Sequence, residues 1–355
     1  MERILREITI GIHQEGQRLD RFLTKYMPLA PKSFIYKMLR KKNIKLNAAK
    51  AEGRESLSQG DVVTLYLAED TIEGFRRGAA DGEETKEQKR QASVAKNRRR
   101  QRDPGQKIRI LSEDEHVLVL FKPVGMLSQK ADRNDVSVVE HVKEYLVESG
   151  QLSPEDLQTF QPGICNRLDR NTSGLIVAGK TVQGLQWMNA LFRHRDLKKY
   201  YLAVVWGKVE KPRRLQGYLV KDGSHNTVSI SSVPQERAEY IETEYQPLGV
   251  GQMDGRPYTL LRVHLITGKS HQIRAHLHSI GHPIAGDGKY GRKDMYHAFK
   301  KQFGLDHQLL HAWRLELGSP DYLPRKYHGA EWMAPVPEDF AKICRSLGLK
   351  LPEGA

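Results

Sequence analysis

The stretch NRLDRNTSGLIVAGK, residues 166–180, joins the densest polar motif of the chain to a run that reads as a buried strand. Asp169 lies between Arg167 and Arg170, and the strand-like residues GLIVAG follow at 174–179. An aspartate in such a position is usually a turn former or a cap. Other motifs of the chain are therefore needed to tell whether Asp169 is a catalytic residue or a turn former.

Around this stretch, residues 107–350 form one long block of well-patterned segments. Strands are predicted at IRIL (108–111), VLVLF (117–121), YYLAVVWGKV (200–209) and TLLRVHLI (259–266). Amphipathic helices are predicted at 135–150, 181–196 and 269–281. Strands dominate and do not alternate regularly with helices, so a doubly wound nucleotide-binding fold is excluded.

A smaller unit, residues 8–68, precedes this block. Leu19, Phe22, Leu23, Tyr26 and Met27 have the spacing of one apolar helix face. A second helix follows with apolar residues on one side, and its other faces and end carry the cations Lys32, Lys37, Arg40, Lys41 and Lys42. Short strands follow at 44–47 and 61–67. A basic helix over a small sheet can lie along a phosphate backbone.

Residues 69–106, between the two units, have few large apolar residues and no periodic pattern. Such a stretch buries too little surface to offset its ordering entropy, so we predict a flexible linker. Its second half is strongly basic, which suits either a solvated tether or contact with an RNA backbone.

The whole chain is basic as well as long. Its 355 residues include 57 Lys and Arg against 43 Asp and Glu, giving a net charge of +14. Such an excess favours a polyanionic partner, above all nucleic acid. Two cysteines cannot build a disulfide framework or a paired-cysteine zinc site. We find no membrane-span pattern and no secretory signal, and we expect a cytoplasmic protein with no membrane partner.

Four further motifs accompany Asp169. They are FKPVGMLSQ (121–129), KKYYLAVVWG (198–207), LITGKSHQIRAHLHSIGHPIAGDGKYG (265–291) and LLHAWRLEL (309–317). In this order they resemble the RluA/RluC/RluD-type family of pseudouridine synthases, over nearly all of 108–340. Residues 18–67 resemble an S4-type RNA-binding domain, with Asn47-Ala48 in place of its usual Asn-Gly turn. The resemblance implies an α+β fold, with an S4-like domain before a mixed, mainly antiparallel catalytic sheet flanked by helices.

The resemblance also implies roles for residues. Asp169 would be the nucleophile that converts uridine to pseudouridine, and Arg274 would pair with it, in principle through two hydrogen bonds. Tyr201 would stack on the target base. Leu175 and Ile273 would be apolar walls. Arg167, Asn166, Lys269 and His271 would bind the substrate; Asn166 and Lys269 replace the family's usual His and Arg. The attacked atom stays open between C6, C1′ and a glycal route.

These observations predict a cofactor-free isomerase that binds RNA, with large-subunit ribosomal RNA as the expected substrate. The alternatives are a transfer-RNA pseudouridine synthase and an RNA-binding or ribosome-assembly factor without catalysis. A metal-dependent hydrolase would rest only on His271, His276, His278 and His282, which lack an accompanying ligand set, so we predict no metal. We expect a monomer.

Overall fold

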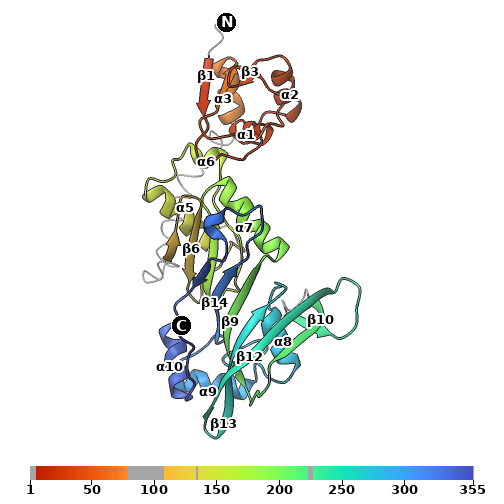
Figure 1. Cartoon of the computed structure of the whole chain (residues 1–355), viewed down its shortest axis with the longest axis vertical. Coiled ribbons are helices and arrows are strands. Elements are labelled where there is room, and N and C mark those ends of the chain that lie inside the picture. Colours follow the sequence, from red (N-terminus) through yellow and green to blue (C-terminus); the bar gives the residue numbers. More distant parts are fainter. Residues whose placement is uncertain (1–4, 78–107, 133–134, 223–226, 355) are drawn as a thin grey trace.

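The computed structural model describes residues 5–77, 108–132, 135–222 and 227–354, which form two separate β-sheets. Figure 1 shows an elongated molecule with the smaller sheet near the N-terminus and the larger sheet through the rest. Each sheet belongs to a unit with its own apolar cluster. Within the described residues, no helix is long and apolar enough to cross a membrane.

The N-terminal unit is a four-stranded antiparallel sheet covered by helices. The strand order is β1-β4-β2-β3, with β1 at Leu5–Thr9, β2 at Ile44–Leu46, β3 at Ala49–Lys50 and β4 at Val62–Tyr66. Helices α1 (Leu19–Tyr26) and α2 (Lys32–Arg40) bury the apolar faces that their spacing predicts. The five predicted cations of α2 and its end are all exposed.

The predicted end of this unit at residue 68 is wrong. Helix α3, Glu69–Arg77, continues it, and Ile72 is completely buried while Phe75 packs on Phe34 with ring centroids 4.7 Å apart. Two apolar residues three apart are a weak signal in so charged a segment, and only the neighbouring helices give them a surface to bury against. The unit also begins earlier than predicted, at Leu5. The remainder of the predicted linker, 78–106, lies outside the described residues.

The turn between β2 and β3 strains the backbone at Ala48. Asn47 and Ala48 have φ values of 51° and 61°, as a two-residue turn of this type requires. Asn47 tolerates this region, and its side chain donates to Asp61 and accepts from the Val62 N–H. Ala48 has no such compensation, because its Cβ crowds the following carbonyl.

We therefore expect Ala48→Gly to stabilise the N-terminal unit by roughly 1 kcal/mol. Hydrogen exchange of the β2 and β4 amides measures the gain. Ala49→Gly is the matched control, since it places the same residue one step along in a strand, where glycine destabilises. Equal protection changes in the two variants would show that the turn is not strained.

The second unit contains the block 107–350, which the resemblance predicts to be catalytic, and we call it the catalytic unit. It is built on an 11-stranded sheet. The order is β11-β10-β12-β13-β9-β14-β8-β6-β5, with β15 beside β14 and β7 beside β8. Among the described strands only β8 and β14 pair in parallel, which confirms the predicted mixed, mainly antiparallel sheet. Its strands are β5 (Arg109–Glu113), β6 (Val117–Lys122), β7 (Gly163–Ile164), β8 (Ser173–Gly179), β9 (Leu197–Trp206), β10 (Arg213–Asp222), β11 (Thr227–Ser231), β12 (Glu239–Met253), β13 (Arg256–Leu265), β14 (Leu310–Leu317) and β15 (Glu331–Met333).

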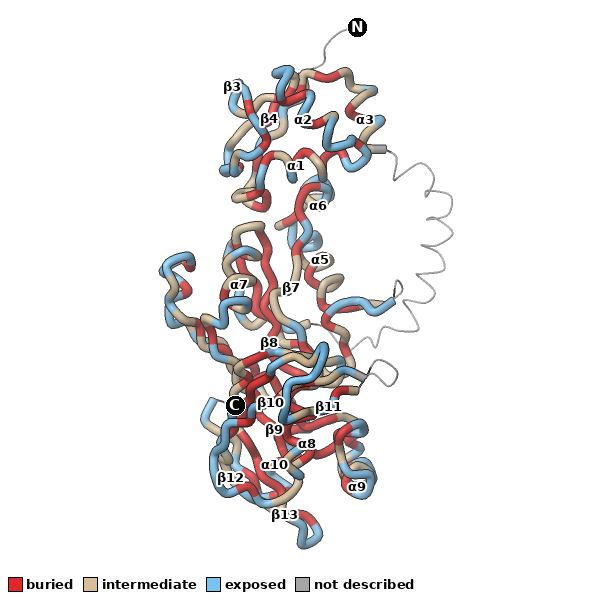
Figure 2. Tube along the Cα trace, turned by 90° about the vertical axis from the view of Figure 1, so that its right-hand side faces the viewer, coloured by how far each residue is buried: buried red, intermediate tan, exposed pale blue. Residues whose placement is uncertain are grey.

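Helices flank this sheet, and the tube in Figure 2 shows buried residues running through its central strands. The helices are α5 (Val138–Glu148), α6 (Asp156–Thr159), α7 (Val182–His194), α8 (Gln272–Ser279), α9 (Lys293–Phe303) and α10 (Glu338–Ser346), with a 3₁₀ turn at Arg325–Tyr327. Strand β8 is buried along its whole length. Gly174, its second residue, has φ 125°, and a Cβ there would lie 2.1 Å from the Ala312 carbonyl oxygen, so only glycine lets β14 approach β8.

The two units contact each other through the segment after β1. Both ring nitrogens of buried His13 lie within hydrogen-bond distance of catalytic-unit carbonyls, those of Lys180 and Gln151. Gln14 donates to Asp156 and Thr159 at α6. This contact holds the N-terminal unit beside α6, as Figure 1 shows.

Candidate active site

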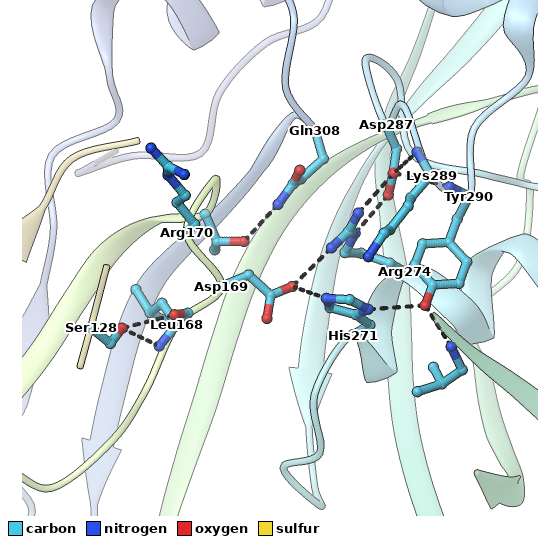
Figure 3. A network of polar contacts seen from close by, with 12 residues as sticks. Ser128, Leu168, Asp169, Arg170, His271, Arg274, Asp287, Lys289, Tyr290 and Gln308 are labelled. Carbon is cyan, nitrogen blue, oxygen red and sulfur yellow. Dashed lines mark hydrogen bonds and ion pairs between the residues drawn. The ribbon is translucent and has the colours of Figure 1, made fainter. Parts of the chain in front are cut away.

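Asp169 lies in a short loop just before β8, and hydrogen bonds fix the backbone of the residues on both sides of it, Leu168 and Arg170. The Ser128 hydroxyl donates to the Leu168 carbonyl at 2.8 Å and accepts from its N–H at 3.0 Å. The Arg170 carbonyl accepts from the ammonium of fully buried Lys122 at 2.9 Å. Lys122 and Ser128 both belong to the 121–129 motif, so that motif holds the Asp169 backbone in place. Figure 3 shows the contacts of Ser128 with Leu168.

Lys122 is the least expected of the residues that hold the Asp169 loop. Its three N–H groups meet three carbonyls, those of Pro123, Met126 and Arg170, at 2.8–2.9 Å. Burial lowers the pKa of Lys122 to about 7, and the nearby Asp169 carboxylate opposes that shift. Nothing in the sequence pattern distinguishes this lysine from a surface cation, because its partners are backbone atoms brought together by the fold.

Arg274, on α8, connects Asp169 to a second carboxylate. Its Nη1 donates to Asp169 Oδ2 at 3.1 Å, as the sequence predicts. Its two-bond fork goes elsewhere: Nε and Nη2 donate to Asp287 at 2.7 and 2.9 Å. The predicted two-bond pairing with Asp169 is therefore wrong, because Asp287 occupies the fork and leaves one N–H for Asp169.

Asp287 is the residue that our sequence reasoning missed, although it lies in the quoted motif 265–291. Its side chain is fully buried, and it also accepts the backbone N–H groups of Lys289 and Tyr290. Burial alone would raise the pKa of Asp287, but the hydrogen bonds and charge of Arg274 outweigh it and hold that pKa below its usual value. Asp287 thus stays charged and fixes the orientation of Arg274.

His271 faces Asp169 from the start of α8. Its backbone has a φ of 57°, an uncommon conformation for this residue type that turns the ring toward the pocket. The Tyr290 hydroxyl accepts from the Val228 N–H at 2.8 Å, so its own proton is free for His271 Nδ1, 3.0 Å away. Burial lowers the pKa of His271 and favours the neutral ring. Its Nε2–H then points at Asp169 Oδ2, 3.9 Å away (Figure 3).

Asp169, His271 and Arg274 line one pocket of about 390 Å³, a size typical of small-molecule sites. Tyr201, on β9, forms part of its wall, and burial together with the Asp169 charge raises the pKa of Tyr201. All nine residues predicted for the catalytic unit line this pocket: Asn166, Arg167, Asp169, Leu175, Tyr201, Lys269, His271, Ile273 and Arg274. The fold therefore brings together segments more than 100 residues apart in sequence.

Comparison with known proteins gives one answer. The family model for RNA pseudouridylate synthase matches residues 116–279. The chain is 28% identical over 345 residues to the ribosomal large subunit pseudouridine synthase D of Nitrosomonas europaea, covering 96% of this chain and 87% of that protein. It is 27% identical to the ribosomal large subunit pseudouridine synthase C of Vibrio parahaemolyticus, covering 95% and 94%.

The part of the chain that this family model matches, residues 116–279, is an RNA pseudouridine synthase domain. Its fold agrees with this, since the solved structure of human RNA pseudouridylate synthase domain containing 4 superposes with a TM-score of 0.54 at 22% identity. That superposition covers 69% of this chain and 94% of the human chain. Within this family, the two departures of this synthase from the usual motif have structural explanations.

The first departure, Asn166, is engaged with the protein itself. Its side-chain amide donates to the Leu175 carbonyl at 3.0 Å and accepts from the Val177 N–H at 2.8 Å. The side chain therefore ties the loop to β8, and its contact with the substrate stays a prediction. An amide supplies the donor and the acceptor that this strand edge needs.

The second departure, Lys269, forms an ion pair with Glu239 on β12 and is half-exposed at the pocket edge. Arg167 is exposed and has no salt bridge with a described residue, which leaves its charge available to a ligand. The histidines of the 265–291 motif do not converge: His276 contacts Thr243, and His282 contacts the Trp206 carbonyl. No group of ligand side chains suited to a metal exists among the described residues.

Proposed function

We propose that this synthase isomerises specific uridines of large-subunit ribosomal RNA, with Asp169 as nucleophile. The relatives named above carry ribosomal large subunit in their names and match almost the whole chain, which supports this substrate. The observation that carries the proposal is the contact of Asp169 with Arg274 in a pocket walled by Tyr201. An RNA-binding factor without catalysis would have no need of that arrangement.

The reaction breaks the N1–C1′ bond, turns the uracil and forms a C5–C1′ bond, while the proton on C5 is lost and N1 gains one. A carboxylate suits this exchange because covalent catalysis divides one difficult step into two. Arg274 supplies the positive charge that keeps Asp169 anionic and oriented, and Asp287 holds Arg274. Tyr201 and the apolar residues Leu175 and Ile273 provide the surface against which the base lies.

The target base has to leave its RNA stack to reach the pocket, which costs a few kcal/mol that backbone contacts must offset. We propose that the N-terminal unit supplies part of that contact as an S4-type domain. The support is its exposed cations, Lys32, Lys37, Arg40, Lys41 and Lys42, none of which forms a salt bridge with a described residue. The protein would act as a monomer in the cytoplasm and need no cofactor.

Pseudouridine mapping of cellular RNA tests the proposal. Cells that carry Asp169→Asn as the sole copy should lose modification at defined uridines of the large-subunit RNA and keep it elsewhere. Loss in transfer RNA instead would change the assigned substrate. An unchanged map would refute the proposal that Asp169 is the nucleophile.

The role of α2 makes a separate prediction. Replacing Lys37, Arg40 and Lys41 together by glutamine should reduce the slope of log affinity against log salt by about 2, since each lost phosphate contact contributes roughly 0.7–0.9. The reaction rate at saturating RNA should stay unchanged. The control replaces exposed Lys300 and Lys301 on α9, at the far end of the molecule from α2 (Figure 1). Equal slopes for both variants would leave the N-terminal unit without an RNA role.

A further inference from the structure

The pocket extends beyond Asp169 to the turn between α7 and β9. Lys199 and Arg195 line it there, together with Phe192 and Gly268. Lys199 precedes Tyr201 by two residues on β9, and side chains two apart on a strand share a face about 7 Å apart. A Cβ on Gly268 would lie 3.3 Å from the Lys199 ammonium, so this charge borders the loop before α8.

Lys199 and Arg195 have no counter-ion within the part of the chain that the structure describes. Neither Lys199 nor Arg195 forms a salt bridge with any residue that the structure describes. Burial, and next the positive charge of Arg195, lower the pKa of Lys199 to about 8. The nearby carboxylate of Asp196 accepts from the Tyr322 hydroxyl at 2.7 Å instead.

Three of the four other cations of the pocket are paired, and the fourth, Arg167, is exposed to solvent. Arg274 pairs with Asp169 and Asp287, and Lys269 pairs with Glu239. Arg314 pairs with glutamates on its own strand and on β15. A half-buried lysine beside an arginine, with no carboxylate between them, destabilises the free protein. Binding an anion removes that penalty.

The backbone conformation of Arg195 also supports an anion-binding site. This residue caps α7 in the left-handed conformation with φ 64°, a position where glycine is the usual choice. An arginine here keeps a strained backbone and gains a charged side chain at the pocket wall. Strain of this kind concentrates at functional sites.

We propose that Lys199 and Arg195 form a phosphate subsite, which holds a backbone phosphate next to the uridine whose base lies against Tyr201. The subsite rests on the proposed function, because a phosphodiester is the only anion that a uridine in RNA brings into the pocket. Lys199 acts as a point charge on one oxygen, and Arg195 adds a second cation from the α7–β9 turn. The subsite would fix the sugar relative to Asp169.

Binding of small nucleotides tests the subsite without RNA and without turnover. Uridine, uridine 5′-monophosphate and uridine 3′-monophosphate are titrated into the full chain and followed by NMR. At least one monophosphate should bind about 10-fold more tightly than uridine, equal to about 1.4 kcal/mol. The preferred isomer tells which flanking phosphate occupies the subsite.

Lys199→Met should abolish this preference and leave uridine binding unchanged. Lys198→Met is the matched control, because Lys198 is exposed and its ammonium lies 3.8 Å from Glu316. That variant should retain the preference. Equal binding of all three ligands by the wild type, or an intact preference in Lys199→Met, would overturn the subsite.

Thermal stability provides an independent measurement. Removing an unneutralised cation should raise the Tm of the ligand-free Lys199→Met protein, by roughly 2–4 °C. A fall in Tm would mean that Lys199 is a structural residue and would overturn the proposal. The two hypotheses separate cleanly: a preference for the monophosphate without pseudouridine formation refutes the proposed reaction alone, and pseudouridine formation without the preference refutes the subsite alone.

Discussion

Asp169→Asn should lower the rate of pseudouridine formation by at least about 10⁴-fold, the scale seen when a nucleophile is removed from a preorganised site. Asparagine has nearly the same shape, and its side-chain oxygen can still accept from Arg274 Nη1. The pocket therefore stays intact while the anion that attacks the nucleoside disappears. RNA carrying tritium at C5 of uridine measures the rate, because the C5 hydrogen leaves as the C5–C1′ bond forms.

Two controls separate chemistry from folding and binding. The Asp169→Asn protein should bind RNA with wild-type affinity, and its Tm should change little, since Asp169 is partly exposed and has one strong contact. Asp306→Asn removes an exposed carboxylate outside the pocket and should release tritium at the normal rate. Tritium release by Asp169→Asn within 10-fold of wild type would exclude Asp169 as the nucleophile.

Arg274→Met should damage both activity and stability. Activity should fall by about 10²–10³-fold, because a preorganised charge next to the reacting carboxylate is lost. Stability should fall by about 3–5 kcal/mol at neutral pH, since Asp287 becomes a fully buried charge without its cation. Chemical denaturation measures the second effect.

The pH dependence of this variant identifies the cause. In the wild type, the lowered pKa of Asp287 contributes stability above its unfolded pKa of about 3.9, and that stability is lost as pH falls. Without Arg274, burial raises the pKa of Asp287 in the folded state. The stability difference between the two proteins should therefore shrink as pH falls toward 4 and grow toward 7.

The double variant Arg274→Met/Asp287→Asn is the matched comparison. Removing the unpaired charge should recover part of the lost stability and none of the lost activity. If the double variant were no more stable than Arg274→Met, the stability loss would have to come from packing and not from the charge on Asp287.

The helices and strands that the sequence predicts are present in the structure because their patterns are local. The apolar faces of α1 and α2, the buried strand β8 and the helix α7 all follow from the spacing of their own residues. Helix α3 was missed for the same reason, since Ile72 and Phe75 are a weak pattern until Phe34 lies opposite them.

The candidate site shows what local sequence patterns cannot predict. The motifs contain Asp169, Tyr201 and Arg274, and the fold does bring them to one pocket. Their neighbours could not be deduced in the same way. The guanidinium of Arg274 donates two hydrogen bonds to Asp287, and the side-chain amide of Asn166 hydrogen-bonds to the backbone of β8. A motif specifies residue types, while hydrogen-bond partners depend on directions and distances.

The order of residues along the chain establishes which chemistry is possible: a carboxylate, a tyrosine and a guanidinium in family order, on a chain with a charge of +14. It also predicts those helices and strands whose periodicity and turn residues act over a few positions. Which charges neutralise one another is set by the three-dimensional fold. Asp287 holds Arg274, Lys122 holds the Asp169 loop, and Lys199 has no counter-ion among the described residues. Electrostatic pairing depends on separation in space and on burial, and neither can be read from separation along the chain.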